Sequence, residues 1–298
     1  MKLKPRYTAK LKLKCQDDGM KVKDVMSSPV RVIAPEETIA HARRLMLKHG
    51  IGRLVVVDDE KAIGIVTKSD LMWKLRQAGS MWRRRSIDHI PVRVVMSENP
   101  ITTYPDALLE EVEELMLENN ISGLPVMDKG LVGMISKFDI VRQFSSTKSR
   151  VRVGDIMSDF VVTVHRHHSI AHVIDEMQKN EVHRVIVMED DDTPVGIITS
   201  SNLAFTELED ERGEMSEKGI KMTRKDSPAG RKRFRDIEKK GLVAEDVMSS
   251  PLITVSKDEL AVNAAKMLIE HKIEGMPVMD KGLAGVIAKT DIIRMLWG

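Results

Sequence analysis

Four similar segments of the chain end in an acid or amide, and three of them have a small hydroxyl residue three positions earlier, where the fourth has Ala288. They read GIVTKSD ending at Asp70, GMISKFD ending at Asp139, GIITSSN ending at Asn202, and GVIAKTD ending at Asp291. Each is expected where a strand ends and a helix begins, so free backbone N–H groups and the helix dipole favour a phosphate. A hydroxyl at Thr67, Ser136 or Thr199 can donate to that phosphate, and the carboxylate can accept both hydrogen bonds of a ribose diol.

The same motif also has a purely structural interpretation. Asp and Asn are favoured helix N-caps worth about 1 kcal/mol, and a cap repeated four times would give the same pattern. Residue type and position alone do not separate binding from capping.

A second motif precedes each of these segments and shows that the chain is a repeat. A Val-Met or Ile-Met pair occurs at Met26, Met96, Met157 and Met248, and the hydroxyl-containing motif ends 43 to 45 residues later. Self-similarity at a fixed period identifies a repeat architecture. We call the four units copies one to four, the first motif the start motif and the second the finish motif.

Each copy has the predicted order strand, helix, strand, strand, helix. Apolar residues at helical spacing predict the first helix in copy two (Leu108, Val112, Leu115, Met116) and in copy three (Ile170, Val173, Ile174, Met177). In copy four, Ser256 and Glu259 have capping-box spacing. Short apolar runs, 53–57 and 123–127, then predict covered, mostly parallel sheets. One unit of this size cannot bury both faces of a sheet, so the copies should pack in two pairs.

The expected boundaries follow from these motifs and from the charged connectors. They are a basic tail (1–21), copy one (22–79), copy two (93–146), copy three (152–207), a charged linker or insertion (208–242) and copy four (243–298).

The repeated start and finish motifs resemble those of the CBS-domain family, whose units pair into Bateman modules. The resemblance implies an α/β fold of β-α-β-β-α repeats and clefts that hold AMP, ADP, ATP or S-adenosylmethionine. It implies no obligatory cofactor and no catalysis, with occupancy relayed to a regulated partner protein. Self-association, as a homodimer, is also implied.

By the same resemblance, the finish-motif residues take the roles given above, and further positions join them. Phosphate contacts are implied for Arg53, His183 and Arg184, just before the central strand. Copies two and four have Ser122-Gly123 and Glu274-Gly275 there. Backbone groups near Ile101 and Ile253 are implied to meet adenine. Only some clefts should therefore accept phosphate, and those using Asp70 and Asp139 rank first.

Composition sets further limits. The 298 residues include 47 Lys and Arg against 45 Asp and Glu, a net charge of +2, so global charge indicates no polyanionic partner. A single cysteine, Cys15, and the lack of a long apolar stretch predict a cytoplasmic protein with no membrane contact.

Two alternatives to a ligand-binding regulator remain open. One is a nucleic-acid-binding regulator that uses the basic run Arg83–Arg85 and the basic stretch 221–240; the other is a structural dimerisation protein whose motif residues are only caps. His165, His167 and His168 lack ligand spacing, so no metal site is expected. No nucleophile and base arrangement or phosphate-binding glycine loop suggests an enzyme.

Overall fold

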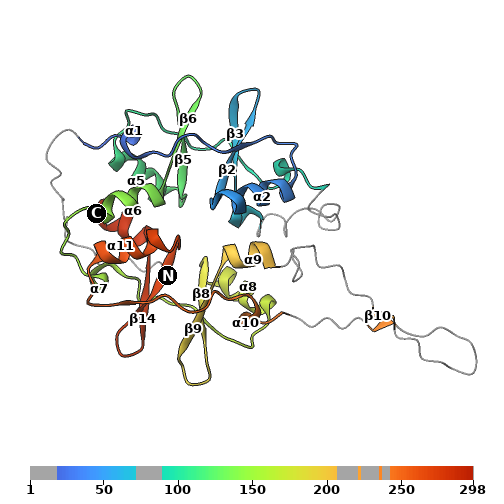
Figure 1. Cartoon of the computed structure of the whole chain (residues 1–298), viewed down its shortest axis with the longest axis vertical. Coiled ribbons are helices and arrows are strands. Elements are labelled where there is room, and N and C mark those ends of the chain that lie inside the picture. Colours follow the sequence, from blue (N-terminus) through green and yellow to red (C-terminus); the bar gives the residue numbers. More distant parts are fainter. Residues whose placement is uncertain (1–18, 72–88, 207–220, 223–234, 237–241, 298) are drawn as a thin grey trace, which may run out of the picture. The chain divides into compact units, whose positions relative to one another are not determined.

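The computed structural model describes residues 19–71, 89–206, 221–222, 235–236 and 242–297. Within them, each copy has the expected order of elements (Figure 1). Copy one contains β1 (Val32–Ile33), α2 (Ile39–His49), β2 (Arg53–Asp58) and β3 (Lys61–Thr67), and a helix begins at 68–71. Copy two contains β4 (Ser97–Glu98), α5 (Leu109–Glu118), β5 (Gly123–Met127), β6 (Leu131–Ser136) and α6 (Lys137–Ser145).

The second half of the chain repeats this order. Copy three contains β7 (Thr163–His165), α8 (Ile170–Lys179), β8 (Arg184–Met188), β9 (Pro194–Thr199) and α9 (Ser200–Thr206). Copy four contains β12 (Val255–Ser256), α11 (Ala261–Glu270), β13 (Gly275–Met279), β14 (Leu283–Ala288) and α12 (Lys289–Trp297). The charged segment between them contributes one two-stranded ladder, β10 (Lys221–Met222) with β11 (Arg235–Asp236).

The prediction of mostly parallel sheets is wrong. The long pairings, β2 with β3, β5 with β6, β8 with β9, and β13 with β14, are all antiparallel hairpins. Among the described residues, the parallel pairings are β1 with β2, β7 with β8, β12 with β13, and the isolated bridge of Thr103 with Val126, whereas β4 pairs antiparallel with β3. A turn as tight as Asp59-Glu60, where both residues have positive φ, can only reverse the chain, which requires antiparallel strands.

Capping residues define the two ends of α2, whereas the predicted cap of α11 differs from the observed one. The Thr38 hydroxyl caps α2 by accepting from the His41 N–H, and Gly50 ends that helix with a φ of 61°. The predicted capping box of Ser256 and Glu259 is wrong. The N-cap of α11 is Leu260, and the Ser256 hydroxyl accepts from the Asp258 N–H in a turn before the helix.

The start motif of each copy packs against another copy. Each motif contains a short helix: α1 (Val22–Val25), the 3-10 helix η2 (Val92–Val94), α7 (Val153–Ile156) or α10 (Ala244–Val247). After α1, the Met26 side chain lies against Gly133 of copy two, and Ser27 and Met134 exchange backbone hydrogen bonds of 2.9 and 3.0 Å. In return, Met96 of copy two lies against Gly64 of copy one. Copies one and two are thus joined by an exchange of segments.

The chain divides into two compact units, residues 1–161 with 253–298, and residues 162–252. In the first, the start of copy three packs on copy four, where Met157 lies against Gly285. In the second, the start of copy four packs on copy three, where Met248 lies against Gly196. The second pair is therefore defined by the same exchange, and the four repeats form two Bateman modules.

The methionine and glycine contact predicts a sharp sensitivity at Gly133. A Cβ there would overlap the Met26 sulfur, so Gly133→Ala should lower the free energy of unfolding by about 1–3 kcal/mol. Gly130→Ala is the matched control, because nothing lies within 4 Å of its added Cβ. Denaturant unfolding measures both. Equal effects of the two substitutions would contradict the packing role.

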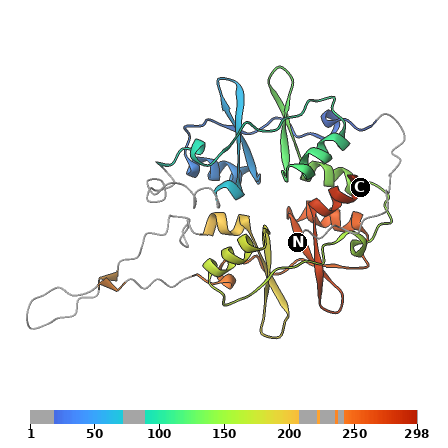
Figure 2. The ribbon, with the colours of Figure 1, turned by 180° about the vertical axis from the view of Figure 1, so that it is seen from behind.

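The first unit buries one continuous core that includes residues of α5, α6, α11 and α12, which lie side by side in both views (Figure 1 and Figure 2). Among these helices, the carboxyl of Glu113 is buried, with an exposed fraction of 5%. Burial and the nearby charge of Glu110 raise the pKa of Glu113 from 4.5 to about 8. The equivalent positions in copies three and four carry the buried residues Ile174 and Ala265.

The raised pKa of Glu113 predicts a pH-dependent stability. Because the folded pKa lies above the unfolded one, stability is fully present below pH 4.5 and declines as pH rises through about 8. Glu113→Gln should match the parent protein at low pH and exceed it at pH 9 by up to about 5 kcal/mol. Glu114→Gln, on the exposed face, is the control. Parallel stability curves for parent and Glu113→Gln would refute the prediction.

Candidate ligand clefts

The finish motif folds into the same hydrogen-bonded box in copies one and two. In copy one, Asp70 Oδ2 accepts from the Thr67 N–H at 2.8 Å and from the Thr67 hydroxyl at 2.6 Å. In copy two, Asp139 Oδ2 accepts from the Ser136 N–H at 3.0 Å and from its hydroxyl at 2.6 Å. The motif thus has a structural role at each strand-to-helix junction.

The capping role differs in detail from the expected one. Ser136 is the N-cap of α6, and Asp139 lies three residues later, closing a capping box with it. The carboxylate therefore uses one oxygen for the cap and turns the other outward from the box. Capping and ligand binding are compatible in one side chain.

The second oxygen of Asp139 faces the start motif of copy one. Asp139 Oδ1 accepts from the Ser27 hydroxyl at 2.9 Å and from Arg142 at 3.2 Å, and Asp139 is only 2% exposed. The side chain that would hold a ribose is thus placed beside the start of the paired copy, and the cleft is composite.

Asn202 makes the same box in copy three with different chemistry. Its Oδ1 accepts from the Thr199 N–H at 3.0 Å and from the Thr199 hydroxyl at 2.7 Å. Its Nδ2 donates to the carbonyl of Val247 and the hydroxyl of Ser249. An amide therefore preserves the cap but presents a donor where Asp139 presents an acceptor.

Copy four keeps the acid without the hydroxyl. Asp291 Oδ2 accepts from the Ala288 N–H at 2.8 Å, and Oδ1 accepts from Arg294 at 3.0 Å. The helix is still capped, but Ala288 offers no hydroxyl to a phosphate.

The basic residues before the central strand lie opposite the hydroxyl residues. Across each hairpin, Arg53 pairs with Thr67 and Arg184 with Thr199. Directly opposite residues of an antiparallel pair point to the same face of the sheet. Each arginine side chain therefore lies on the same face as the hydroxyl of its own copy. The neighbouring His183 accepts a backbone hydrogen bond from Ser200, the first residue of α9.

Arg53 also reaches into the paired copy. Its guanidinium fills the space beside Gly123, which has no side chain to obstruct it. Burial lowers the pKa of Arg53, while the carboxylates of Glu274 and Asp139 act in the opposite direction. Arg53 therefore lies within electrostatic reach of the carboxylate proposed for ribose.

A lysine that was not among the predicted site residues follows the hydroxyl position in three copies: Lys68, Lys137 and Lys289. Lys137 donates to the Thr290 hydroxyl at 3.0 Å, and Lys289 pairs with Glu274 at 3.0 Å. Burial lowers the pKa of Lys68, and Glu274 opposes this. The lysine shared by TKSD, SKFD and AKTD is the sequence signal that could have identified this position.

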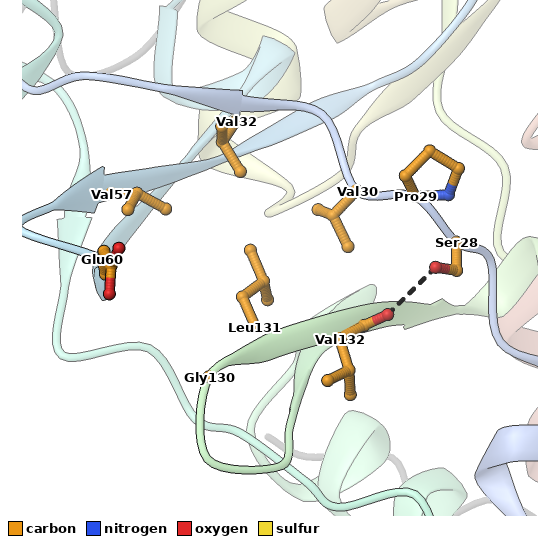
Figure 3. Close-up of a pocket in the computed structure, with 9 residues that line it drawn as sticks. All are labelled: Ser28, Pro29, Val30, Val32, Val57, Glu60, Gly130, Leu131 and Val132. Carbon is orange, nitrogen blue, oxygen red and sulfur yellow. Dashed lines mark hydrogen bonds between the residues drawn. The ribbon is translucent and has the colours of Figure 1, made fainter.

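A cavity of about 410 Å³ lies between copies one and two (Figure 3). It is lined by Ser28, Pro29, Val30, Val32, Val57, Glu60, Gly130, Leu131 and Val132. One hydrogen bond, from the Ser28 hydroxyl to the Val132 carbonyl at 3.1 Å, crosses it. The mainly apolar lining of the cavity includes Glu60 and Gly130 near the turns of the two hairpins, whereas Arg53 and Ser136 lie at the opposite ends of these strands.

The two residues expected near adenine follow the corresponding start motifs. Ile101, 37% exposed, lies shortly before Thr103, which pairs with Val126 of β5. Ile253 is half-buried against the core of the first unit.

The histidines lie beside carboxylates and beside one another. His165 Nε2 lies 2.8 Å from Asp190, and His167 lies 3.5 Å from Glu245. Burial, followed by His172 and His165, lowers the pKa of His168. Among the described residues, no group of three or more His, Cys, Asp or Glu side chains is arranged to hold a metal ion.

Other expectations concern segments that lie mostly outside the described residues. The run Arg83–Arg85 lies outside the described residues, as does the 221–240 stretch except for β10 and β11. In the described part of the chain, no helix has the length and apolar character needed to span a bilayer.

Comparison with known proteins identifies the class of protein. The CBS domain model matches residues 22–77, 87–146, 153–207 and 243–298, about three quarters of the chain. The chain therefore belongs to the CBS-domain family.

The chain is also similar to several individual proteins. Uncharacterized protein MJ1404 of Methanocaldococcus jannaschii is 26% identical over 92% of the chain, which spans 61% of that relative. The structure of MJ1225 from the same organism, suggested to be an archaeal homologue of g-AMPK, matches 92% of the chain and 99% of its own at 22% identity, with a TM-score of 0.74. The CBS domain pair of MJ0100, solved with 5′-methylthioadenosine and S-adenosyl-L-methionine, is 30% identical over 44% of the chain and all of its own, with a TM-score of 0.39.

The two functions of the finish motif can be separated by two substitutions at Asp139. Asp139→Asn should keep the capping box, as Asn202 does, and change the thermal midpoint little. Asp139→Ala removes the acceptor of the Ser136 N–H and should cost about 1–2 kcal/mol. Thermal melting without ligand compares them. An equal loss in both variants would contradict the capping argument.

Proposed function

We propose that the protein is a non-catalytic regulator that binds an adenosine compound, AMP, ADP, ATP or S-adenosylmethionine, in clefts between paired CBS repeats. The compound is a ligand rather than an obligatory cofactor. Its binding changes the tilt of the paired repeats and so the surface offered to a regulated partner protein. We further propose a cytoplasmic, self-associating molecule, consistent with the single cysteine.

One observation carries the proposal. In the pair of copies one and two, the Asp139 capping box and the guanidinium of Arg53 beside Gly123 lie within electrostatic reach of each other. These two features offer a ribose acceptor and a phosphate-binding cation. Membership in the CBS family gives the adenosine class independent support.

The four clefts should not be equivalent. We rank those using Asp70 and Asp139 first, because each has a carboxylate and a hydroxyl. The amide of Asn202 donates to the Ser249 hydroxyl, and Asp291 has no hydroxyl beside it, which weakens the other two.

Thermal melting with ligand tests the proposal. A ligand that binds only the folded state must raise the melting temperature, by a few degrees at a concentration of about 100 times Kd. Adenosine compounds should give this shift and GTP should not. The parent protein is compared with Asp70→Asn and Asp139→Asn, each of which keeps the cap and should lose part of the shift.

The controls distinguish the alternatives. Glu114→Gln, on the exposed face of α5, should retain the shift of the parent protein. No shift with any adenosine compound would overturn the binding proposal. A full shift in the double variant Asp70→Asn, Asp139→Asn would place the ligand elsewhere.

A further inference from the structure

An acidic side chain, Glu274, lies at the position that precedes the central strand of copy four. The backbone places it in the same way as its counterparts, because the residue after the finish-motif hydroxyl position donates to its carbonyl in every copy. These bonds run from Lys68 to Gly52, Lys137 to Ser122, Ser200 to His183 and Lys289 to Glu274. Copy three thus has a histidine where copy four has a carboxylate.

The Glu274 carboxylate is held by a cation at the start of a helix. Its Oε1 lies 3.0 Å from Lys289 Nζ, and the Lys289 side chain is only 4% exposed, whereas that of Glu274 is 59% exposed. The Lys289 ammonium also lies 5.0 Å from the ring centroid of Phe138, the residue before Asp139. The anion is therefore placed next to the helix start that carries the Asp139 capping box.

The same carboxylate lies within electrostatic range of two cations of copy one. Glu274 acts on both Arg53 and Lys68, opposing the effect of their burial on the pKa of each. Arg53 is the cation that reaches past Gly123 toward Asp139. The position where a ligand phosphate would meet Arg53 is thus already within reach of a protein carboxylate.

We propose that Glu274 acts as a resident anion at the phosphate end of the cleft shared by copies one and two. A polyphosphate would have to compete with this carboxylate for the cations and would be repelled by it. The cleft therefore selects adenosine compounds whose 5′ substituent is neutral or cationic, such as a thioether or a sulfonium, over nucleoside triphosphates. This inference rests on the proposed function and specifies the ligand class of the same site.

Isothermal titration of the full chain with 5′-methylthioadenosine, AMP and ATP tests the inference. In the parent protein, 5′-methylthioadenosine should bind at least about tenfold more tightly than ATP. Glu274→Gln, which can still accept from Lys289, should strengthen ATP binding about tenfold and leave 5′-methylthioadenosine within about twofold. Glu274→His, which installs the residue of copy three, should shift the preference further toward ATP.

Glu270→Gln is the matched control, because it removes one negative charge from an exposed position of the same copy. It should leave the ratio of the two affinities unchanged. Melting without ligand checks that each variant is folded.

Three results would overturn the inference. They are a parent protein that prefers ATP, an unchanged affinity ratio in both folded Glu274 variants, or a loss of all binding in them, which would make Glu274 a direct ligand contact. Absence of binding by every compound to the parent protein would instead remove the proposed function itself.

Discussion

The contact between a start-motif methionine and a finish-motif glycine is the interaction on which the rest of the architecture depends. Four times, a methionine side chain fills the space that a missing Cβ leaves on a strand of another copy. Backbone hydrogen bonds on either side, such as those between Ser27 and Met134, fix the register of the contact. Because this contact brings the start of copy one against the finish of copy two, it also places Ser27 on Asp139. Pairing and site formation are one event.

The site itself is built from groups that already stabilise the fold. Asp139 uses one oxygen to cap α6 and the other to contact the paired copy. Arg53 lies at a strand end, opposite Thr67, where Gly123 gives it room. A ligand entering such a cleft would change contacts that hold two copies together, which is how occupancy could alter their arrangement.

Much of the fold could be predicted from the sequence, and the features that could not be predicted depend on contacts between distant segments. The repeat, the order of elements and the pairing of copies follow from motif spacing and apolar periodicity, which are local signals. The exchange of start motifs is not local, because nothing in residues 22–33 states which hairpin they will cover. Tight turns such as 128–130 indicate antiparallel hairpins. The apolar runs on each side of the turn are instead typical of covered parallel strands, so the two signals disagree.

The site shows the same division. The finish motif marks where Asp70 and Asp139 lie, since each copy repeats it. At Glu274 the sequence shows only the lack of a basic residue, because the effect of its carboxylate depends on Lys289, Arg53 and Lys68 from three separate segments. The lysine after the hydroxyl position recurs in three copies, but its contacts, such as those of Lys137 with Thr290 and Lys289 with Glu274, depend on the folded structure.

The capping box of Asn202 has a consequence for how such chains evolve and are surveyed. Selection for a stable helix start is enough to retain a hydroxyl and an oxygen acceptor three residues apart, whether or not the repeat binds a nucleotide. Counting finish motifs in genome sequences therefore counts strand-to-helix junctions that are capped, and not sites that bind a ligand. The number of working clefts is recorded instead in the few positions the cap does not constrain, such as the amide in place of an acid at Asn202.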